Sequence, residues 1–434
     1  MARFRLLQGM GAIALLSIAS AAFATQDELA ARRVAVVHTF TGTPDGIQPM
    51  GGLAKGPDGG LYGTTVYGGE YGYDPLSGAN GNGTIFRIST NNTYSVLYSF
   101  THLQADFSNT DGRWPDRTLA IAPDGTLYGV TPYGGSADGG AVFAFAPTTA
   151  FAATGMNFTP LHYFADVGND PFGNLPKARP VVAADGSLAG TTQYGGANGL
   201  GTLFRMETDG TGFAVLQSFG NAAVAGLPNG NLLATGDGTL YGLTGSTGAQ
   251  LYRTAADGTQ FSLLHTFDYA TEGGFYYAGV IPAPTEGPGG YLYGVTADGG
   301  SGGSGQGAIY RIAHDGSGFS VLHSFGPIDS NLANTGGARP RAGLLVGNDG
   351  RLYGATQLGG PNGAGVLYRM EVDGSAFTVL YAFSALSRRG TNRSGAYPTG
   401  DIVFDETGRL CGTAYAGGGS GFGTVYCLKL PAGG

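Results

Sequence analysis

Short runs of alternating apolar and polar residues fill most of the chain, and glycine-rich turns separate them. One representative stretch reads AGLLVG, the turn NDG, RLYGAT, the loop QLGGPNGAG, VLYRMEV, the turn DGS and finally AFTVLYAF. Alternation with a period of two predicts β-strands, and Asp-Gly turns are typical of β-hairpins. The stretch therefore predicts four antiparallel strands in sequence.

This four-strand stretch recurs, and its second strand carries the most regular phrase. The phrase occurs seven times, as LYGTT at Leu61, LYGVT at Leu127, LAGTT at Leu188, LYGLT at Leu240, LYGVT at Leu292, LYGAT at Leu352 and LCGTA at Leu410. Successive copies begin 52 to 66 residues apart, which is the spacing of a four-stranded propeller blade with variable loops. The repeat thus predicts seven blades.

Two further markers set the limits of each blade. Six copies have a proline fourteen residues before the glycine of the phrase, where we expect it to open the first strand: Pro49, Pro115, Pro176, Pro228, Pro340 and Pro398. The last strand also occurs seven times, and its copies end at Phe40, Phe100, Phe164, Phe219, Phe267, Phe325 and Phe383.

The first copy of that last strand, RVAVVHTF, precedes the first complete unit, whereas the final unit ends GTVYCLKL without one. We therefore predict an all-β fold, a single seven-bladed β-propeller over residues 33–430 whose N-terminal strand completes the last blade. Such closure leaves no open sheet edge, and it explains the missing strand better than a solenoid with capping units.

Composition and the N-terminus indicate an exported protein. The chain of 434 residues has 82 glycines, 24 tyrosines and 24 phenylalanines, which suits many short strands joined by tight turns. Residues 1–24 combine the basic MARFR, an apolar run and the cleavage pattern AFA, so we predict a signal peptide; a retained membrane anchor is the alternative. Residues 25–32 would be a short linker and 431–434 a tail. We expect a periplasmic or secreted bacterial monomer with no membrane contact after cleavage.

Charge and motifs limit the chemistry. With 22 Lys and Arg against 30 Asp and Glu, nothing in the charge balance favours a nucleic-acid partner. Zinc-ligand spacing, a calcium loop, a phosphate loop and a nucleophile elbow are all missing from the sequence, so we predict no cofactor and no metal.

The repeat also resembles a known family. The pattern DGxLYGTTxxGGxxGxGTxFR followed by VLxSF is similar to the GloVer tandem repeat of exported bacterial proteins, and the similarity covers essentially all of residues 33–430. The resemblance implies a repeat-built, propeller-like exported domain, often joined to one of several C-terminal sorting anchors. This chain ends LKLPAGG, without the apolar tail of such an anchor. The family supplies no catalytic residues to carry over.

Candidate ligand-binding residues lie in the longer loops. These loops follow the second strand of a blade or connect two blades, and both kinds fall on one face of a propeller, which we call the long-loop face. Tyr67, Tyr133, Tyr194 and Tyr415 occupy matching places there and would form a partial aromatic ring, unless each ring only packs over its own glycine turn. Polar side chains also gather around the opening prolines: Arg113, Trp114, Asp116, Lys177, Arg179, Arg339, Arg341, Arg393 and Tyr397. Guanidinium groups suit carboxylates, sulfates or phosphates, although pairing with loop carboxylates is the alternative.

Two functions follow as hypotheses. The first is a binding or scaffold propeller whose long-loop face holds an envelope or extracellular glycan, an anionic polymer or a partner protein. The second is a carbohydrate-active enzyme, best a polyuronate lyase, with Tyr397 or His102 as weak candidates for proton transfer. His38, His162, His265 and His323 recur at one position of the last strand, so we interpret them as structural.

The two cysteines of the chain lie in the last blade. Cys411 replaces the tyrosine found in most copies of the second strand, and Cys427 replaces the arginine of the third strand. The same sixteen-residue separation joins Tyr353 and Arg369 in blade six, so the cysteines should face each other across a hairpin. We predict a structural disulfide there, with a redox or metal role or free thiols as alternatives.

Overall fold

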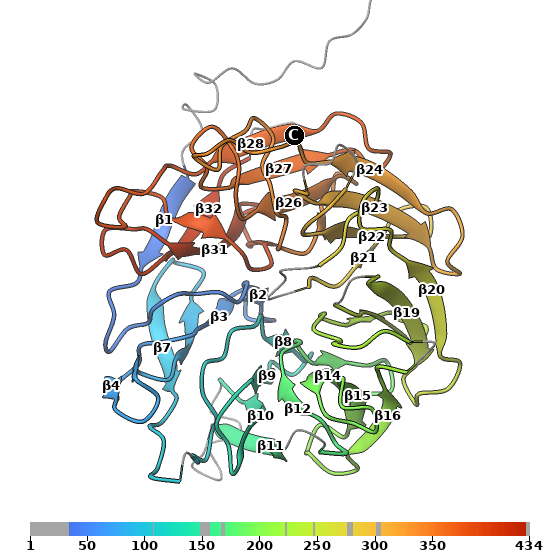
Figure 1. The fold of residues 1–434 in the computed structure, drawn as a ribbon. Coiled ribbons are helices and arrows are strands. Elements are labelled where there is room, and N and C mark those ends of the chain that lie inside the picture. The colour runs from blue at the N-terminus through green and yellow to red at the C-terminus, as the bar shows by residue number, and fades with distance from the viewer. Residues whose placement is uncertain are drawn as a thin grey trace, which may run out of the picture.

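The repeats form seven four-stranded antiparallel blades in a ring, as the sequence predicted (Figure 1). The computed structural model describes residues 34–106, 108–147, 157–165, 170–221, 224–245, 248–275, 281–300 and 305–430. The predicted signal peptide, the linker and the tail lie outside the described residues. No helix in the described part of the chain is long and apolar enough to cross a membrane.

The strands run outward from the central channel in the order of the sequence. Blade one contains β2 (Ala54–Lys55), β3 (Leu61–Thr65), β6 (Thr84–Ile88) and β7 (Tyr94–Ser99), and a small hairpin of β4 (Tyr73–Asp74) and β5 (Ala79–Asn80) extends its loop. Blade two contains β8 (Ala120–Ile121), β9 (Leu127–Thr131), β10 (Asp138–Phe145) and β11 (Phe158–Ala165). Blade three contains β12 (Asn174–Pro176), β13 (Val181–Val182), β14 (Leu188–Tyr194), β15 (Thr202–Met206) and β16 (Ala214–Ser218).

The remaining blades repeat this order. Blade four contains β17 (Leu233–Ala234), β18 (Thr239–Leu243), β19 (Gln250–Ala255) and β20 (Ser262–Thr266). Blade five contains β21 (Thr285–Gly287), β22 (Tyr291–Thr296), β23 (Ala308–Ala313) and β24 (Ser320–Ser324). Blade six contains β25 (Leu345–Val346), β26 (Leu352–Thr356), β27 (Val366–Met370) and β28 (Thr378–Ala382).

Blade seven is built from both ends of the described chain. It contains β29 (Ala396–Pro398), β30 (Val403–Phe404), β31 (Leu410–Ala416) and β32 (Thr424–Leu428), and β1 (Val34–Thr39) is its outermost strand. β1 pairs antiparallel with β32, with Ala35 opposite Cys427. This pairing confirms that the N-terminal strand completes the last blade.

An aromatic ring lies over the glycine of the repeated phrase in every blade. The ring belongs to the residue directly opposite on the third strand, as Phe86 is opposite Gly63 in blade one. A Cβ atom added to Gly63 would lie 2.4 Å from the Phe86 ring, so no larger residue fits. The terminal Phe40 of the preceding blade packs against the same ring, with centroids 5.3 Å apart. The glycine of the phrase thus makes room for a ring that joins two blades.

The opening prolines form a second joint between blades. In each of the six blades, the proline ring packs against a glycine at the start of the third strand of the preceding blade, as Pro176 does against Gly140. The residue before each of these prolines has a positive φ, from 52° to 64°. In five blades its N–H donates to a carbonyl beside that glycine, as Trp114 does to Asn82 at 2.9 Å.

This joint corrects one expectation about the first strand. The prolines do not open a continuous strand, because Pro176 and Pro398 end the short strands β12 and β29. Pairing with the second strand resumes only at Val181 and Val403. The intervening residues leave the sheet and line the central channel, so the first strand of these blades is interrupted where the site residues lie.

The recurring histidines occupy one structural position, as expected. Each imidazole stacks on an aromatic ring of the next blade, and His323 lies 3.9 Å from Phe377 between ring centroids. Burial lowers the pKa of His323 to about 4. His38 and His265 also contact carboxylates, at 3.0 Å from Asp45 and 2.8 Å from Glu272.

The proline joint predicts a large effect of a single methyl group. Gly140→Ala should lower the free energy of unfolding by about 3 kcal/mol, because its Cβ would lie 2.4 Å from the Thr131 carbonyl oxygen and 2.7 Å from Pro176. Gly186→Ala is the matched control, since Gly186 also has a positive φ but no atom within 4 Å of the added Cβ. Gly186→Ala should lower the free energy of unfolding by only about 1 kcal/mol. Urea unfolding measures both variants. Equal losses of unfolding free energy in Gly140→Ala and Gly186→Ala would contradict tight packing at the proline joint.

The lowered pKa of His323 predicts a loss of stability in acid. Its folded-state pKa lies below the unfolded value, so the stabilisation is complete above about pH 6.5 and is lost as the pH falls toward about 4. The full loss is on the order of 3 kcal/mol. His323→Gln, which copies Gln217 at the same position of blade three, should lose less stability between about pH 7 and about pH 4. Urea unfolding at both pH values measures this difference, and an unchanged pH dependence would contradict the assignment.

Candidate functional site

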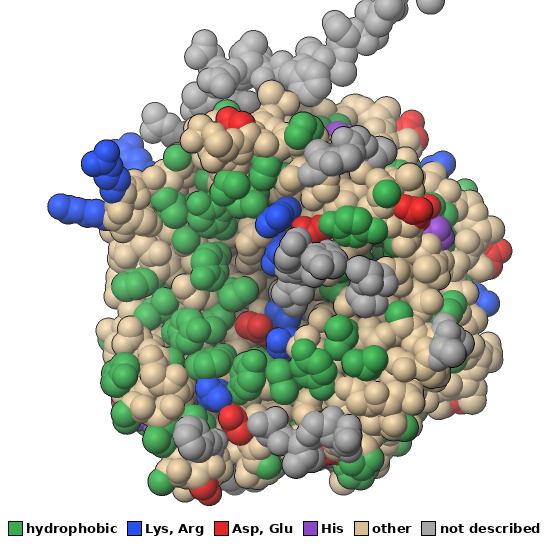
Figure 2. All heavy atoms as spheres, viewed as in Figure 1, with side chains coloured by type: hydrophobic (Ala, Val, Ile, Leu, Met, Phe, Trp, Pro, Cys, Tyr) green, Lys and Arg blue, Asp and Glu red, His purple; other side chains and the backbone are tan. Residues whose placement is uncertain are grey.

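The central channel and the long-loop face hold most of the predicted site residues. Figure 2 views this face and shows hydrophobic side chains gathered over blades seven, one and two, beside a central hollow. Charged side chains of both signs lie within the hollow. The interrupted first strands supply these channel residues, because their chain leaves the sheet after each proline.

Aromatic rings from four neighbouring blades form an arc beside the channel. We call it the aromatic arc, and its members are Tyr415, Tyr67, Trp114, Tyr133 and Tyr194. The Trp114 ring contacts Tyr67 and Tyr133 edge to face, with centroids 5.7 and 5.3 Å apart. Burial, and then the neighbouring Tyr67, raises the pKa of Tyr415. Tyr194 is 39% exposed, and the other four side chains are half-buried.

The Arg113 side chain packs against two rings of this arc and is paired with a carboxylate. Its guanidinium lies over Trp114, 4.2 Å from the ring centroid, and 5.1 Å from that of Tyr133. Asp138 accepts two hydrogen bonds from Arg113 Nη2, at 3.0 and 3.1 Å. Because the guanidinium is paired and stacked, it fixes the rings more than it offers charge to a ligand. The indole Nε1 of Trp114 is buried and has no hydrogen-bond partner among the described residues.

Charged residues one and two positions after the prolines gather in the channel below the arc. We call Asp116, Arg117, Lys177 and Arg341 the channel plug. Arg117 is only 4% exposed, forms an ion pair with Asp116 at 3.2 Å and donates through Nε to the carbonyl of Lys177. Burial lowers the pKa of Lys177, whereas the nearby Asp116 carboxylate opposes this shift. The plug therefore concentrates positive charge in a chain whose formal net charge is −8.

In four blades the third residue after the proline has a polar side chain, and these four residues form a layer in the channel. We call Thr118, Arg179, Asn231 and Asp401 the channel ring. Thr118 Oγ1 donates to Asp401 at 3.2 Å, and the N–H of Arg179 donates to Asn231 Oδ1 at 2.8 Å. Arg179 Nη1 lies 4.0 Å from Asp401 Oδ2. Only Arg179 of this layer was predicted from the sequence. The signal for the other three is their shared position, three residues after a proline.

The other candidates lie in different surroundings. Arg339 contacts Asp298 at 3.5 Å, and Arg393 is exposed on the loop before blade seven. Tyr397 packs against the apolar core shared by blades six and seven. His102 instead contacts the carbonyl of Gly72 at 3.3 Å, in the outer loop of blade one. None of the described contacts joins Tyr397 to His102 or brings either to the channel plug.

The disulfide joins β31 and β32 of the closure blade. Cys411 and Cys427 are direct partners in the sheet, their Cα atoms lie 4.0 Å apart and their sulfur atoms are bonded. Both side chains are buried. This geometry confirms the predicted pairing of the two cysteines.

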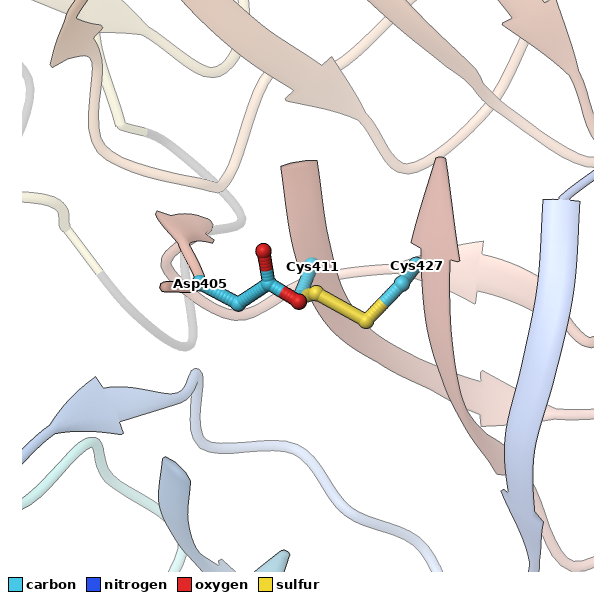
Figure 3. A group of neighbouring side chains, drawn as sticks. All are labelled: Asp405, Cys411 and Cys427. Carbon is cyan, nitrogen blue, oxygen red and sulfur yellow. A yellow bond between two sulfur atoms is a disulfide. The ribbon is translucent and has the colours of Figure 1, made fainter. Parts of the chain in front are cut away.

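A carboxylate lies beside this disulfide, as Figure 3 shows. Asp405, Cys411 and Cys427 are close enough together to be considered as a metal site, but the two sulfurs are bonded to each other. Blade one has Gly56 at the equivalent position, where an added Cβ would lie 2.7 Å from the ring of Tyr62. In blade seven Cys411 stands at the position of this tyrosine, so no ring fills the space and the Asp405 side chain fits there. The carboxylate accepts hydrogen bonds from Arg409, at 2.7 Å from Nε and 2.8 Å from the backbone N–H.

Removing the disulfide should weaken the ring at its closure blade. Cys411→Ala combined with Cys427→Ala should lower the free energy of unfolding by about 3 kcal/mol, because the sixteen-residue loop becomes free in the unfolded chain. Guanidinium unfolding without reductant measures the loss. The parent protein in reductant is the control and should approach the double variant. A parent unaffected by reductant would contradict the bond.

Comparisons with known proteins show the repeat family and the fold. The family model of the Gloeobacter/Verrucomicrobia repeat matches three overlapping segments, residues 28–250, 151–335 and 251–434. No curated protein sequence matches the chain.

Similar solved structures share the fold at low sequence identity. A fungal alcohol oxidase of the AA5 family in complex with copper is 14% identical, with a TM-score of 0.51, over 92% of this chain and 76% of that chain. The extracellular domain of the hybrid two component system BT3049 from B. thetaiotaomicron is 13% identical, with a TM-score of 0.50, over 87% of this chain. The match spans 40% of that second chain. At such identities the likeness concerns the fold alone.

The family match covers the whole described region and agrees with the repeat read from the sequence. The seven blades of the structure account for all seven copies of the phrase. The chain therefore belongs to the Gloeobacter/Verrucomicrobia repeat family.

Proposed function

We propose that this propeller is an exported binding protein that holds an acidic saccharide on its long-loop face. The observation that carries the proposal is the aromatic arc, five rings from four neighbouring blades beside the channel. Aromatic faces provide flat apolar surfaces on which sugar rings can stack. Such a row suits an extended ligand better than a small one.

The channel plug supplies the second element of recognition. Arg341 follows Pro340 and lines the channel below the arc. Lys177 follows Pro176, and its carbonyl accepts a hydrogen bond from Arg117, which lines the same part of the channel. A saccharide lying on the arc would bring its acidic groups toward these cations. Charge-assisted hydrogen bonds to carboxylates or sulfates are stronger than neutral ones, so they would select acidic over neutral glycans.

Two other predictions remain hypotheses. A partner protein could use the same face, and a polyuronate lyase would require a proton-transfer group near the ligand. Tyr397 packs into the core between blades, and His102 lies in an outer loop. This arrangement gives the lyase no support beyond the presence of the residue types. The disulfide is compatible with an exported protein.

Trp114 makes the proposal directly measurable. It is the single tryptophan of the chain, so its fluorescence reports on the centre of the arc. Titration with acidic polysaccharides should change this fluorescence and raise the melting temperature, and neutral polysaccharides should have weaker effects. Tyr67→Ala and Tyr133→Ala should each weaken binding by about tenfold, because each removes one ring next to Trp114.

Tyr73→Ala is the matched control for these variants. Tyr73 is 61% exposed in the outer loop of blade one, so its loss should leave saccharide binding unchanged. The ultraviolet absorbance of unsaturated uronates, followed in the same samples, tests the lyase. No response to any polysaccharide would refute the binding proposal, and turnover lost in Tyr397→Phe would favour the lyase instead.

A further inference from the structure

A cavity lies in the channel on the side away from the aromatic arc. It has a volume of about 470 Å³ and is lined by residues of all seven blades. Its wall residues follow the channel ring in sequence and precede the Asp-Gly turns, as Ala120 follows Thr118. The cavity therefore belongs to the half of the channel that faces the tight turns, and we call it the turn-side cavity. The sequence had predicted a site only on the long-loop face.

Aliphatic side chains form most of its wall. They come from the innermost strands and include Ala120, Val182, Leu233, Leu345 and Val403. The volume lies within the roughly 300–1,000 Å³ that is common for small-molecule sites. Such a wall favours the apolar body of a small ligand.

Charge is placed at the two ends of this cavity. Its charged lining residues within the described chain are Lys55, Arg179 and Asp401. Lys55 is paired with Glu406 at 2.9 Å, near the turns. Arg179 and Asp401 belong to the channel ring, so they lie at the inner end.

The side chains of Asp401 and Arg179 differ in the hydrogen bonds that they make. Asp401 accepts hydrogen bonds from the N–H of Gly343 at 3.0 Å and from Thr118 Oγ1 at 3.2 Å. Arg179 Nε is buried and has no hydrogen-bond partner among the described residues. Its Nη1 reaches Asp401 only at 4.0 Å. The guanidinium thus retains donors that a bound anion could use, and an unmatched buried donor is costly.

We propose that the turn-side cavity binds a small amphiphilic carboxylate, with its carboxylate on Arg179 and its apolar body against the aliphatic wall. The planar guanidinium fork matches a carboxylate. The neighbouring Asp401 carboxylate opposes a doubly charged phosphate, which would meet more repulsion than a singly charged group. This site is separate from the saccharide site, because the plug lies between the two.

Straight-chain carboxylates provide the probe. Isothermal titration with hexanoate, octanoate and decanoate should show binding that strengthens with chain length until the chain outgrows the cavity. Octanol should bind at least about tenfold more weakly than octanoate, since it lacks the charge that Arg179 recognises. Octyl phosphate binding more tightly than octanoate would overturn the assignment to carboxylates.

Substitutions in the cavity wall test whether the ligand binds there. Arg179→Gln should weaken octanoate binding by about tenfold or more, whereas Arg205→Gln should leave it unchanged, because Arg205 pairs with Asp185 at 3.2 Å outside the cavity. Ala120→Leu narrows the wall and should weaken decanoate more than hexanoate, which keeps the test valid if Arg179→Gln does not fold. Trp114→Ala changes the aromatic arc and not this cavity, so it should still bind octanoate. Octanoate binding therefore tests the cavity independently of whether the saccharide proposal holds. Absence of octanoate binding, or equal binding by Arg179→Gln, would refute the inference.

Discussion

An aromatic ring pressed onto a glycine is the contact on which the rest of this propeller depends. The glycine of each repeated phrase has no room for a Cβ atom, because the ring of the opposite residue fills that space. The terminal phenylalanine of the preceding blade packs on the same ring, as Phe383 does on Tyr426 at 5.0 Å. Each blade thus completes its core only with its neighbour.

These contacts recur from blade to blade, whereas the residues that line the channel differ between blades. The proline joint holds the beginning of each first strand, and pairing resumes a few residues later. Between these two points some side chains line the channel, as Arg179 and Asp401 do, whereas Ala178 and Ala342 are buried. The position two residues after the proline differs between blades, because blade two has Arg117 where blade one has Gly51 and blade three has Ala178. The residues proposed for recognition therefore lie at positions that the repeat does not hold constant.

The sequence predicts the parts of the structure that repeat. Blade number, closure by β1 and the pairing of Cys411 with Cys427 all follow from the register of the phrase, which the structure confirms. The channel was harder to predict, because the residue three positions after the proline is a glycine in blades one and six and differs among the four other blades that have this proline. Arg113 was proposed as a ligand-binding cation, but Asp138 at the start of β10 pairs with it. The repeat does not signal this contact, because the five other blades that contribute a glycine to the proline joint have a glycine at the position of Asp138, two residues before the joint glycine.

Closure by β1 has a consequence for how the ring is assembled. β1 is the first described strand to leave the ribosome, and its partner β32 is the last. A nascent chain therefore holds β1 without its partner until nearly all of the repeat has been made. The sequence separation between β1 and β32 is close to the length of the domain. Pairing between segments so far apart in the sequence is slow to form. Once formed, it leaves the N-terminal strand of the propeller paired with β32, so unfolding from that end must first break the closure blade.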